Sequence, residues 1–501
     1  MPRYSNILRE DLIEFREYQD KIATKAVEKN TLVVIPTALG KTVIAIIAIS
    51  ILIKDGGKCI FLAPTRPLVH QHCETLRKFL TLEDYEIVEV TGEIKKEERK
   101  KLYETGRIIV STPQVIDNDQ DLLFEIRKKV VVVVFDEAHR AIGNYAYVRI
   151  AEFFNNSRII ATTASPGGDY AKIDQIVKNL HIENIEIRDE KSPDVIPYLK
   201  GIEVNQVKIQ MPAKYAEVVS QLREMFLDTV QKFSNFSINT EIKSRKDLIA
   251  LGDMISSEIR KGNKYFYAAA KLRTAAIILD YFIEFAETQG LLPLKEYIKE
   301  TKENNRKASV IFKDPRMLSI EQKVEELTKG KIEEHTPKMQ SVIKILSENQ
   351  YSKAIVFCHY RLTAEVLTRI LKNEGFLCEK FIGQSPRSDW KGMSQKEQGL
   401  VIKKFRDGEI KIIVATQVGE EGLDIPSADT VIFYEPVPSE IRSIQRKGRT
   451  GRFGRGRVFI LLMENSRDLS YLYSANRKER KMRYILSDDR RNVQTTFDIF
   501  K

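Results

Sequence analysis

The chain has 501 residues, of which 43% are hydrophobic and 30% are charged. This length exceeds what one hydrophobic core supports, so we expect about two to four domains. No apolar run approaches the roughly 20 residues that span a bilayer, and the N-terminus mixes both charges without an apolar signal core. These features argue against membrane and secreted proteins and predict a cytoplasmic, intracellular protein with no membrane partner.

Lys and Arg together number 81 against 70 Asp and Glu, which gives a formal net charge of +11. A polyanion such as nucleic acid suits this excess, because each neutralised phosphate releases counterions. A charge-rich surface with a modest basic bias explains the excess equally well. The four cysteines form no C-x-x-C pair, so we interpret them as buried thiols rather than as a disulfide framework or a zinc site.

Residues 1–204 alternate apolar strands with amphipathic helices. The continuous β-branched run Val130–Val134 fits the middle of a parallel sheet that helices cover on both faces. The alternation predicts a doubly wound α/β domain, in which ligands bind at the carboxyl ends of the strands. The predicted strands are Thr31–Ile35, Cys59–Ala63, Ile87–Val90, Ile108–Ser111, Val130–Phe135 and Arg158–Thr162.

The first of these strands runs into a loop that predicts a phosphate site. Residues 36–42 read P-T-A-L-G-K-T and precede an apolar helix. Such a loop wraps backbone N–H groups around phosphate oxygens at a helix N-terminus, where the helix dipole favours anions. Lys41 would reach the β- and γ-phosphates of ATP, and Thr42 would bind Mg²⁺. Ile35 stands where the pattern usually opens with glycine.

A carboxylate pair follows the most apolar strand. Asp136 and Glu137 stand directly after Phe135, where buried carboxylates are costly without a cation. An Asp that holds Mg²⁺ beside a Glu that orients or deprotonates the attacking water explains both residues. The alternative is a surface pair that starts the next helix.

Residues 205–334 have helical periodicity and few strand signals, which predicts an all-helical insertion. Gly262-Asn263 and Gln289-Gly290 are predicted helix ends. The predicted helices are Ala213–Lys232, Leu248–Lys261, Tyr265–Gln289 and Leu294–Asn304. A local basic cluster fits a solvated helix face slightly better than a DNA-contacting face. Its members are Lys243, Arg245, Lys246, Arg260, Lys261, Lys264, Lys271 and Arg273.

Residues 335–465 repeat the strand–helix alternation, so we expect a second α/β domain. Its predicted strands are Ala354–Cys358, Cys378–Ile382, Ile410–Ala415, Thr430–Tyr434 and Arg457–Leu462. Residues 445–452 read Q-R-K-G-R-T-G-R. Arginine forks fit a γ-phosphate in its transition state, although the stretch could equally be a basic patch for a nucleic-acid backbone. Residues 466–501 are a basic C-terminal tail, in which we expect a charged helix.

In this order, and in two α/β halves, these elements resemble superfamily 2 helicases with the DEAH spelling. The resemblance implies two tandem RecA-like domains that clamp ATP and Mg²⁺ between them. The residues it implies in catalysis are Lys41, Asp136, Glu137, Gln445, Arg449 and Arg452, with Thr42 and Asp136 at the metal. Those it implies in nucleotide binding are Arg16, Gln19, Thr37, Ala38, Leu39, Gly40, Lys41, Thr42, Gly422 and Asp424. Those it implies in nucleic-acid binding are Thr65, Arg66, Thr91, Gly92, Thr112, Gln114, Tyr360, Arg361, Gly383, Gln384 and Thr416. Thr163, Ala164 and Ser165 are implied in coupling hydrolysis to strand movement.

Four longer strings are more particular, and they resemble the helicase portion of archaeal Hef and its Fanconi anaemia M-type kin. They are His139–Val148, Ser192–Ile202, Val418–Pro426 and Tyr434–Arg452. This resemblance implies ATP-dependent 3′→5′ movement on DNA, a preference for forked or branched DNA, and a role in repairing replication forks. The helical insertion would be a thumb-like element that reads branch shape. A nucleoid-associated location follows, and a sliding clamp or another repair protein is a candidate partner.

Two departures from the family pattern affect these expectations. Ala38 stands where relatives usually carry glycine, and alanine costs about 1 kcal/mol if that position needs a positive φ. We therefore expect slower ATP binding but retained activity. The chain also ends at Lys501 without a nuclease-like acidic motif after residue 465, so we do not predict DNA cleavage.

Two other functions compete with this prediction. A double-stranded-RNA-activated ATPase of the innate-sensor or Dicer type also carries a helical insertion between RecA-like domains. A catalytically silent binding protein could keep the same fold. The intact Lys41, Asp136 and Glu137 argue against the silent protein.

Overall fold

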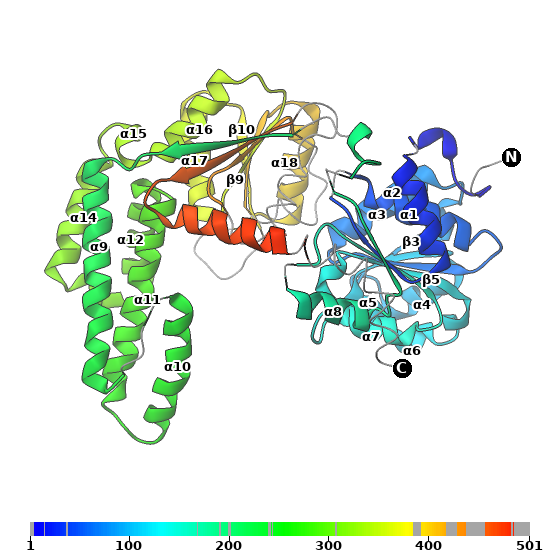
Figure 1. Cartoon of the computed structure of the whole chain (residues 1–501), viewed down its shortest axis with the longest axis horizontal. Helices are drawn as coiled ribbons and strands as arrows, with labels where there is room; N and C mark the ends of the chain where they lie inside the picture. The colour runs from blue at the N-terminus through cyan, green and yellow to red at the C-terminus, as the bar shows by residue number, and fades with distance from the viewer. Residues whose placement is uncertain are drawn as a thin grey trace.

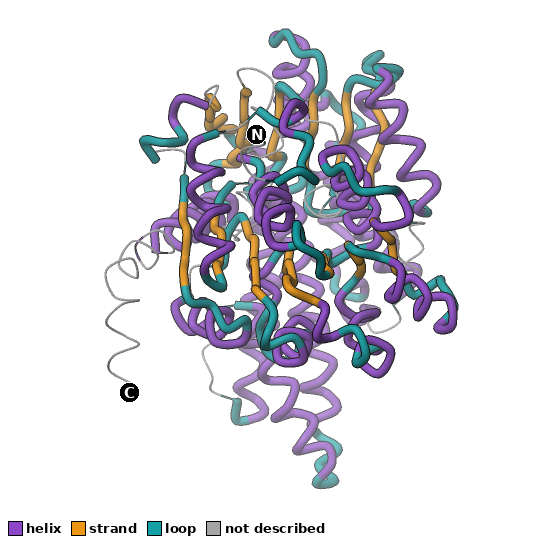
Figure 2. The backbone as a smooth tube through the Cα atoms, turned by 90° about the vertical axis from the view of Figure 1, so that its right-hand side faces the viewer, coloured by secondary structure: helices purple, strands orange, loops and turns teal. Residues whose placement is uncertain are grey.

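The computed structural model describes residues 5–14, 16–36, 39–167, 169–189, 192–198, 202–238, 242, 244–305, 308–383, 392–416, 428–436, 456–481 and 484. These residues form two α/β units and an arm of long helices that extends from the second unit (Figure 1). In each unit the strands of one sheet are flanked by helices (Figure 2). The predicted fold class, two RecA-like domains with a helical insertion, is confirmed.

The first sheet has seven strands in the order β3-β4-β2-β5-β6-β1-β7, and its pairs are parallel. Its strands are β1 (Thr31–Val34), β2 (Lys58–Leu62), β3 (Ile87–Val90), β4 (Ile108–Ser111), β5 (Val130–Asp136), β6 (Arg158–Thr163) and β7 (Asn184–Ile187). Its helices are α1 (Glu17–Glu28), α2 (Lys41–Leu52), α3 (Arg66–Phe79), α4 (Lys96–Thr105), α5 (Pro113–Asn118), α6 (Gln120–Leu123), α7 (Ala146–Phe153) and α8 (Tyr170–Asn179). All six predicted strands are present. Strand β7 was missed because its four residues are only half-buried and carry no continuous apolar run.

The central strands are apolar along their whole length because helices cover both faces of the sheet. Val132, Val133 and Val134 are all fully buried. Neighbouring residues of one strand belong to different cores: Val33 packs in one hydrophobic cluster and Leu32 in the other. Side chains of a strand alternate between the faces, so each face of the sheet has its own core. This burial is what the β-branched run predicted.

The second sheet has six strands in the order β10-β11-β9-β12-β13-β8, and its pairs are also parallel. Its strands are β8 (Ile202–Ile209), β9 (Ala354–Phe357), β10 (Cys378–Phe381), β11 (Ile412–Ala415), β12 (Thr430–Phe433) and β13 (Gly456–Met463). The helices of this second unit are α16 (Pro337–Glu348), α17 (Arg361–Asn373) and α18 (Gln395–Asp407). The five strands predicted after residue 335 are all present.

Strand β8 corrects one expectation from the sequence. Residues 202–204, which we assigned to the first domain, and residues 205–209, which we assigned to the helical insertion, belong to the second sheet, where β8 pairs with β13 from Ile202 to Ile209. The segment reads I-E-V-N-Q-V-K-I, in which the alternation of apolar and polar residues is interrupted at Asn205-Gln206. It therefore gives a weaker strand signal than the regular alternation of a half-exposed strand. It was missed because its pairing partner lies far along the chain.

The arm follows β8 directly and consists of helices. They are α9 (Ala213–Gln231), η7 (Lys232–Phe236), α10 (Arg245–Arg260), α11 (Phe266–Thr288), α12 (Leu291–Asn304), α13 (Ser309–Phe312), α14 (Pro315–Leu327) and α15 (Ile332–His335). At its base the arm shares one buried cluster with the second α/β unit, so that Phe282 of α11 and Phe357 of β9 belong to the same core. Towards its tip a separate small core gathers Phe233, Leu248 and Ile255. The arm is therefore rooted in the second unit.

Two members of the predicted basic cluster serve the arm itself. Arg245 lies over the Tyr281 ring, with its guanidinium carbon 3.7 Å from the ring centroid, and it forms ion pairs with Asp280 and Glu284. The Arg273 Nε donates a hydrogen bond of 2.6 Å to the Leu248 carbonyl. Both side chains therefore stabilise the packing between helices of the arm. Lys243, another member of the cluster, lies outside the described residues.

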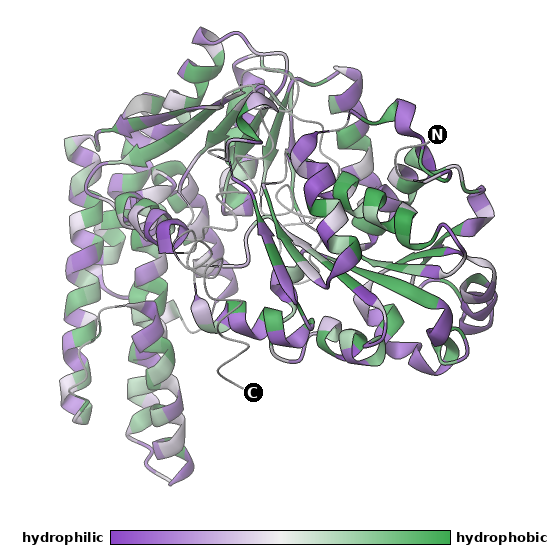
Figure 3. Cartoon of the chain, turned by 45° about the vertical axis from the view of Figure 1, so that its right-hand side comes forward, coloured by the Kyte–Doolittle hydropathy of each residue, from purple (hydrophilic) through white to green (hydrophobic). Residues whose placement is uncertain are grey.

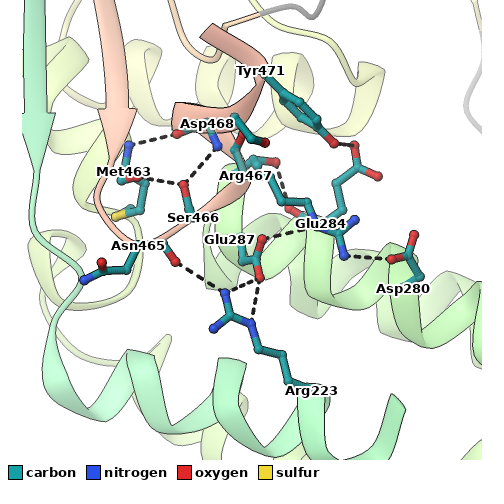
Figure 4. Close-up of polar contacts among 12 residues, drawn as sticks. Arg223, Asp280, Glu284, Glu287, Met463, Asn465, Ser466, Arg467, Asp468 and Tyr471 are labelled. Atoms are coloured by element: carbon teal, nitrogen blue, oxygen red, sulfur yellow. Dashed lines mark hydrogen bonds and ion pairs between the residues drawn. The ribbon is translucent and has the colours of Figure 1, made fainter. Parts of the chain in front are cut away.

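Buried charges tie the arm to the segment after β13, where residues 467–481 are helical (Figure 4). Arg467 donates to Asp280 at 2.7 Å and lies 3.3 Å from Glu287. One residue on, Asp468 pairs with Lys338 of α16 at 2.5 Å. Lys338 also donates to the Thr288 carbonyl at the end of α11. The Lys338 and Asp468 side chains are almost fully enclosed, so each of these two charges depends on its partner.

Apolar residues are concentrated on the strands and on the helix faces that pack against them (Figure 3). Along the described part of the chain, no helix combines the length and the apolar character needed to cross a membrane.

Candidate ATP and nucleic-acid site

Gly40 fixes the shape of the predicted phosphate loop. It is the N-cap of α2 and has φ +76°, a left-handed conformation that favours glycine. A Cβ at this position would lie 2.5 Å from Gln19 Nε2. Lys41 and Thr42 follow in the first turn of α2, with Lys41 buried. Thr37 and Ala38 lie outside the described residues, so the predicted cost of Ala38 stays a prediction.

Helix α1, which carries Gln19 of the residues implied in nucleotide binding, holds this loop. Gln19 Nε2 donates to the Leu39 carbonyl at 3.1 Å, and the buried Tyr18 hydroxyl donates to the same carbonyl at 2.7 Å. The Gln19 Oε1 is buried and accepts no hydrogen bond from the described part of the chain. An acceptor left in this state fits an amino group on a ligand, such as that of adenine. Arg16 lies 5.4 Å from the centroid of the Tyr198 ring.

Glu137 and Lys41 meet at the carboxyl edge of the sheet. Glu137 Oε1 lies 3.5 Å from Lys41 Nζ. Burial alone would raise the pKa of Glu137, but the Lys41 and His139 side chains outweigh it and lower that pKa. The carboxylate is therefore ionised at neutral pH and can orient a water molecule.

The backbone of Glu137 is strained, with φ +51°. A non-glycine residue in this region costs roughly 1–2 kcal/mol, which the surrounding contacts must offset. The buried Tyr147 hydroxyl is one such contact, because it donates to the Asp136 carbonyl at 2.6 Å.

Asp136 is held from both sides. Its Oδ1 accepts a hydrogen bond of 2.7 Å from Thr162 of β6, and its Oδ2 lies 3.0 Å from Nε2 of His72 on α3. Burial would raise the pKa of Asp136, but the hydrogen bond from His72 and the charge of Lys41 lower it further than burial raises it. The buried carboxylate is therefore an anion, as binding Mg²⁺ requires.

The predicted coupling residues are linked to Glu137 through His139. His139 Nδ1 lies 3.3 Å from Glu137 Oε2 and 3.2 Å from Thr163 Oγ1. The backbone N–H of Ser165 donates to the same Thr163 hydroxyl. Thr163 ends β6 and Ala164 follows it buried. A polar chain thus leads from the carboxylates to the loop after β6.

The predicted nucleic-acid residues of the first domain follow three neighbouring strands. Thr65 and Arg66 begin α3 after β2, Thr91 and Gly92 follow β3, and Thr112 begins the turn into α5 after β4, with Gln114 in its first turn. Arg66 forms an ion pair with Glu93, so the start of α3 and the loop after β3 are in contact. In the strand order β3-β4-β2-β5-β6-β1, one half of the edge carries these residues and the other half carries the ATP residues.

In the second domain, the described members also follow three neighbouring strands. Arg361 begins α17 after β9, Gly383 follows β10, and the buried Thr416 follows β11. The Tyr360 ring packs against Phe285 of the arm, with centroids 4.4 Å apart, so it serves the joint between arm and domain. Outside the described residues lie Gln384, Gly422, Asp424, Gln445, Arg449 and Arg452.

The sequence reasoning missed His72, Tyr18 and Thr162. One signal for His72 was present, because it lies with Val69, Cys73 and Leu76 on the buried face of α3. A polar residue within such an apolar stripe needs a partner inside the protein. Which partner it has depends on how α3 packs over β5.

Three family descriptions match the chain. "DEAD/DEAH box helicase" matches residues 16–173, "Helicase conserved C-terminal domain" matches residues 337–454, and "ATP-dependent RNA helicase, helical bundle" matches residues 214–335. The three matches follow the two α/β units and the arm.

Relatives cover nearly the whole chain. An ATP-dependent RNA helicase of Methanocaldococcus jannaschii is 36% identical over 96% of this chain, which spans 62% of that protein. The ATP-dependent DNA helicase fml1 of Schizosaccharomyces pombe is 30% identical over 92% of this chain, which spans 58% of that protein. The crystal structure of the Pyrococcus furiosus Hef helicase domain is 41% identical, has a TM-score of 0.72, and is matched over 94% of this chain and 100% of its own. The chain therefore belongs to the superfamily 2 DEAD/DEAH box helicases, in the family of the Hef helicase domain.

Proposed function

We propose that this protein is an ATP-hydrolysing motor that moves 3′→5′ along DNA and acts inside the cell on forked or branched DNA during the repair of replication forks. The observation that carries the proposal is the pairing of Lys41 and Glu137, 3.5 Å apart, beside the buried anion Asp136. A binding protein without ATPase activity has no need to bury three charged groups in this arrangement. Burying the charges and straining the Glu137 backbone both cost free energy.

The residues around this pair fit ATP and Mg²⁺. The N-terminus of α2 offers backbone N–H groups to phosphates, and Lys41 adds a positive charge for the β- and γ-phosphates. Thr42 and Asp136 would hold Mg²⁺, which neutralises phosphate charge when it is bound. Glu137 would orient the attacking water. Gln19 Oε1, which has no hydrogen-bond partner among the described residues, would accept a hydrogen bond from adenine.

Movement requires the second domain. We assign Gln445, Arg449 and Arg452 to the γ-phosphate side of a closed cleft, on their motif alone. Closure would bind the nucleotide from both sides, and loss of the γ-phosphate after hydrolysis would let the domains part. Strand contacts on both domains would then be released and remade in turn.

Replacing one of these arginines tests the clamp. An arginine supplied to a phosphoryl transition state contributes about 10³- to 10⁵-fold in rate, so Arg452→Ala should lower kcat by orders of magnitude while the affinity for ATP changes much less. Single-turnover ATPase together with binding of a fluorescent ATP analogue separates the two quantities. Unchanged kcat would remove Arg452 from the site.

The nucleic acid is identified by comparing substrates. ATPase and strand displacement would be measured on linear duplex DNA, a DNA fork, a four-way DNA junction and an RNA duplex. We expect the strongest stimulation by forked or four-way DNA, with an affinity that falls steeply with salt because phosphates dominate the contacts. Stimulation by the RNA duplex alone would favour the double-stranded-RNA ATPase, a comparison that matters because some relatives are named RNA helicases and others DNA helicases.

A further inference from the structure

His72 joins the two halves of the first domain's carboxyl edge. Strands β2 and β5 are neighbours in the sheet, with Leu62 opposite Phe135. The residues assigned to nucleic acid lie on the β2 side of this boundary, and those assigned to ATP lie on the β5 side. The imidazole of His72 crosses the boundary and contacts Asp136 Oδ2 at 3.0 Å.

The His72 ring has little freedom to move independently of its helix. It is buried, and it packs on Phe61 of β2 with ring centroids 4.5 Å apart. Since the partner is an ionised carboxylate, Nε2 must carry the proton and donate it. Its neighbours Val69 and Cys73 on α3 are fully buried, so helix and imidazole should shift together.

The same helix begins with the strand-gripping residues. Arg66 stands less than two turns before His72, a rise of about 9 Å along α3. Arg66 forms an ion pair with Glu93 in the loop after β3, and its side chain is half-exposed. A phosphate bound at Arg66 would compete for this contact, so binding of a strand acts directly on the first turn of α3.

We propose that His72 is a positioning residue that couples strand binding at the start of α3 to the orientation of Asp136. This inference rests on the proposed function, because it requires a nucleic acid at Arg66 and ATP with Mg²⁺ at Asp136. Asp136 has a second fixed partner in Thr162, which holds the carboxylate when α3 shifts. A shift of α3 would therefore rotate the Asp136 carboxylate about its hydrogen bond with Thr162. The rotation would change the direction in which the carboxylate oxygens face a bound Mg²⁺.

The test uses the full chain, a forked DNA oligonucleotide and a non-hydrolysable ATP analogue with Mg²⁺. Coupling between two binding sites is a difference in binding free energy, so the dissociation constant for DNA is measured with and without the analogue. The ATPase rate is measured with and without DNA as a separate, kinetic readout. In His72→Leu the donor is lost, and both ratios should fall about tenfold or more. His72→Gln keeps an N–H donor and should retain most of the coupling. His70→Leu is the matched control, since His70 lies on the same helix, exposed, and contacts Glu74 and Glu89 rather than Asp136.

The outcomes separate the two proposals. A wild-type protein whose ATPase no DNA stimulates would remove the proposed function and the coupling with it. If wild type is stimulated, ratios in His72→Leu equal to those of wild type would overturn the coupling alone. The coupling is also overturned if His72→Leu lowers the rate by the same factor with and without DNA, or if His72→Gln behaves like His72→Leu, because both results mark a packing role confined to Asp136.

Discussion

At the scale of single residues, the site depends on a few buried polar contacts that cannot be exchanged. Lys41, Asp136 and Glu137 are buried or nearly so, and each needs a charged or hydrogen-bonding neighbour to remain ionised there. Gly40 is required for a different reason, since both its positive φ and the approach of Gln19 exclude a side chain.

Replacing Glu137 with glutamine should separate ATP binding from hydrolysis. Glu137→Gln keeps the shape of the side chain but removes the charge that orients or deprotonates water. Loss of a general base of this kind lowers the rate by about 10²- to 10⁴-fold, while ATP affinity changes little. Steady-state ATPase with parallel analogue binding measures both, and normal turnover would refute the role given to Glu137.

At the scale of secondary-structure elements, helix caps and the ion pairs of the joint at the base of the arm stabilise the fold. Helix α14 begins with a side-chain cap, because Asp314 accepts a hydrogen bond from the Arg316 backbone N–H, and Pro315 occupies the first helical position. The joint relies instead on enclosed ion pairs between α11, α16 and the segment after β13. The stability that the Asp314 cap contributes should depend on pH, whereas the stability that the joint contributes should depend on keeping both partners of each ion pair.

Asp314 should stabilise the arm at neutral pH but not in acid. Its hydrogen bond with the Arg316 side chain lowers the pKa of Asp314 below the ordinary 3.8. A carboxyl whose pKa is lower in the folded state stabilises the fold above its unfolded pKa, and this contribution is lost as the pH falls through the folded pKa. Asp314→Ala should therefore lower Tm at pH 7, by the equivalent of about 1 kcal/mol for a lost cap, and the difference should shrink below about pH 4. A constant difference across the pH range would contradict this.

Lys338 tests the buried joint. Lys338→Met leaves the enclosed Asp468 carboxyl without its partner, which should destabilise the fold by about 3–5 kcal/mol. Burial already raises the pKa of Asp468 even with Lys338 present, so the lone carboxyl would take up a proton more readily. The double variant Lys338→Met with Asp468→Leu should recover much of the loss, as measured by urea unfolding.

Helix α16 also offers the matched control. Lys344 pairs with Glu348 on the exposed face of the same helix, where an ion pair contributes about 0–1 kcal/mol. Lys344→Met should change stability little. Equal losses of stability in Lys338→Met and Lys344→Met would show that the buried ion pair at the joint contributes no more than an exposed one.

At the scale of the whole molecule, two parallel sheets carry at their carboxyl edges most of the assigned residues that the structure describes, and the arm shares a core with the second unit. Motion of the second unit should therefore move the base of the arm with it.

The cysteines give a check on global packing. Cys59, Cys73, Cys358 and Cys378 are all buried, as predicted. Burial raises the pKa of Cys73 to about 12 and that of Cys378 to about 11, so little reactive thiolate forms at neutral pH. We expect a thiol reagent to react slowly with the native protein and to reveal four thiols in denaturant. Rapid labelling of the native state would contradict this packing.

Much of this protein followed from local sequence. Continuous β-branched strands and turn residues predicted the two α/β units, and the loop at Gly40 and Lys41 indicated the residues that we assign to ATP, because each of these patterns lies within a short stretch of the chain. Strand β8 and His72 could not be placed in this way. Both depend on partners distant in sequence, β13 and Asp136, and only the packing of α3 and of the second sheet decides those pairings.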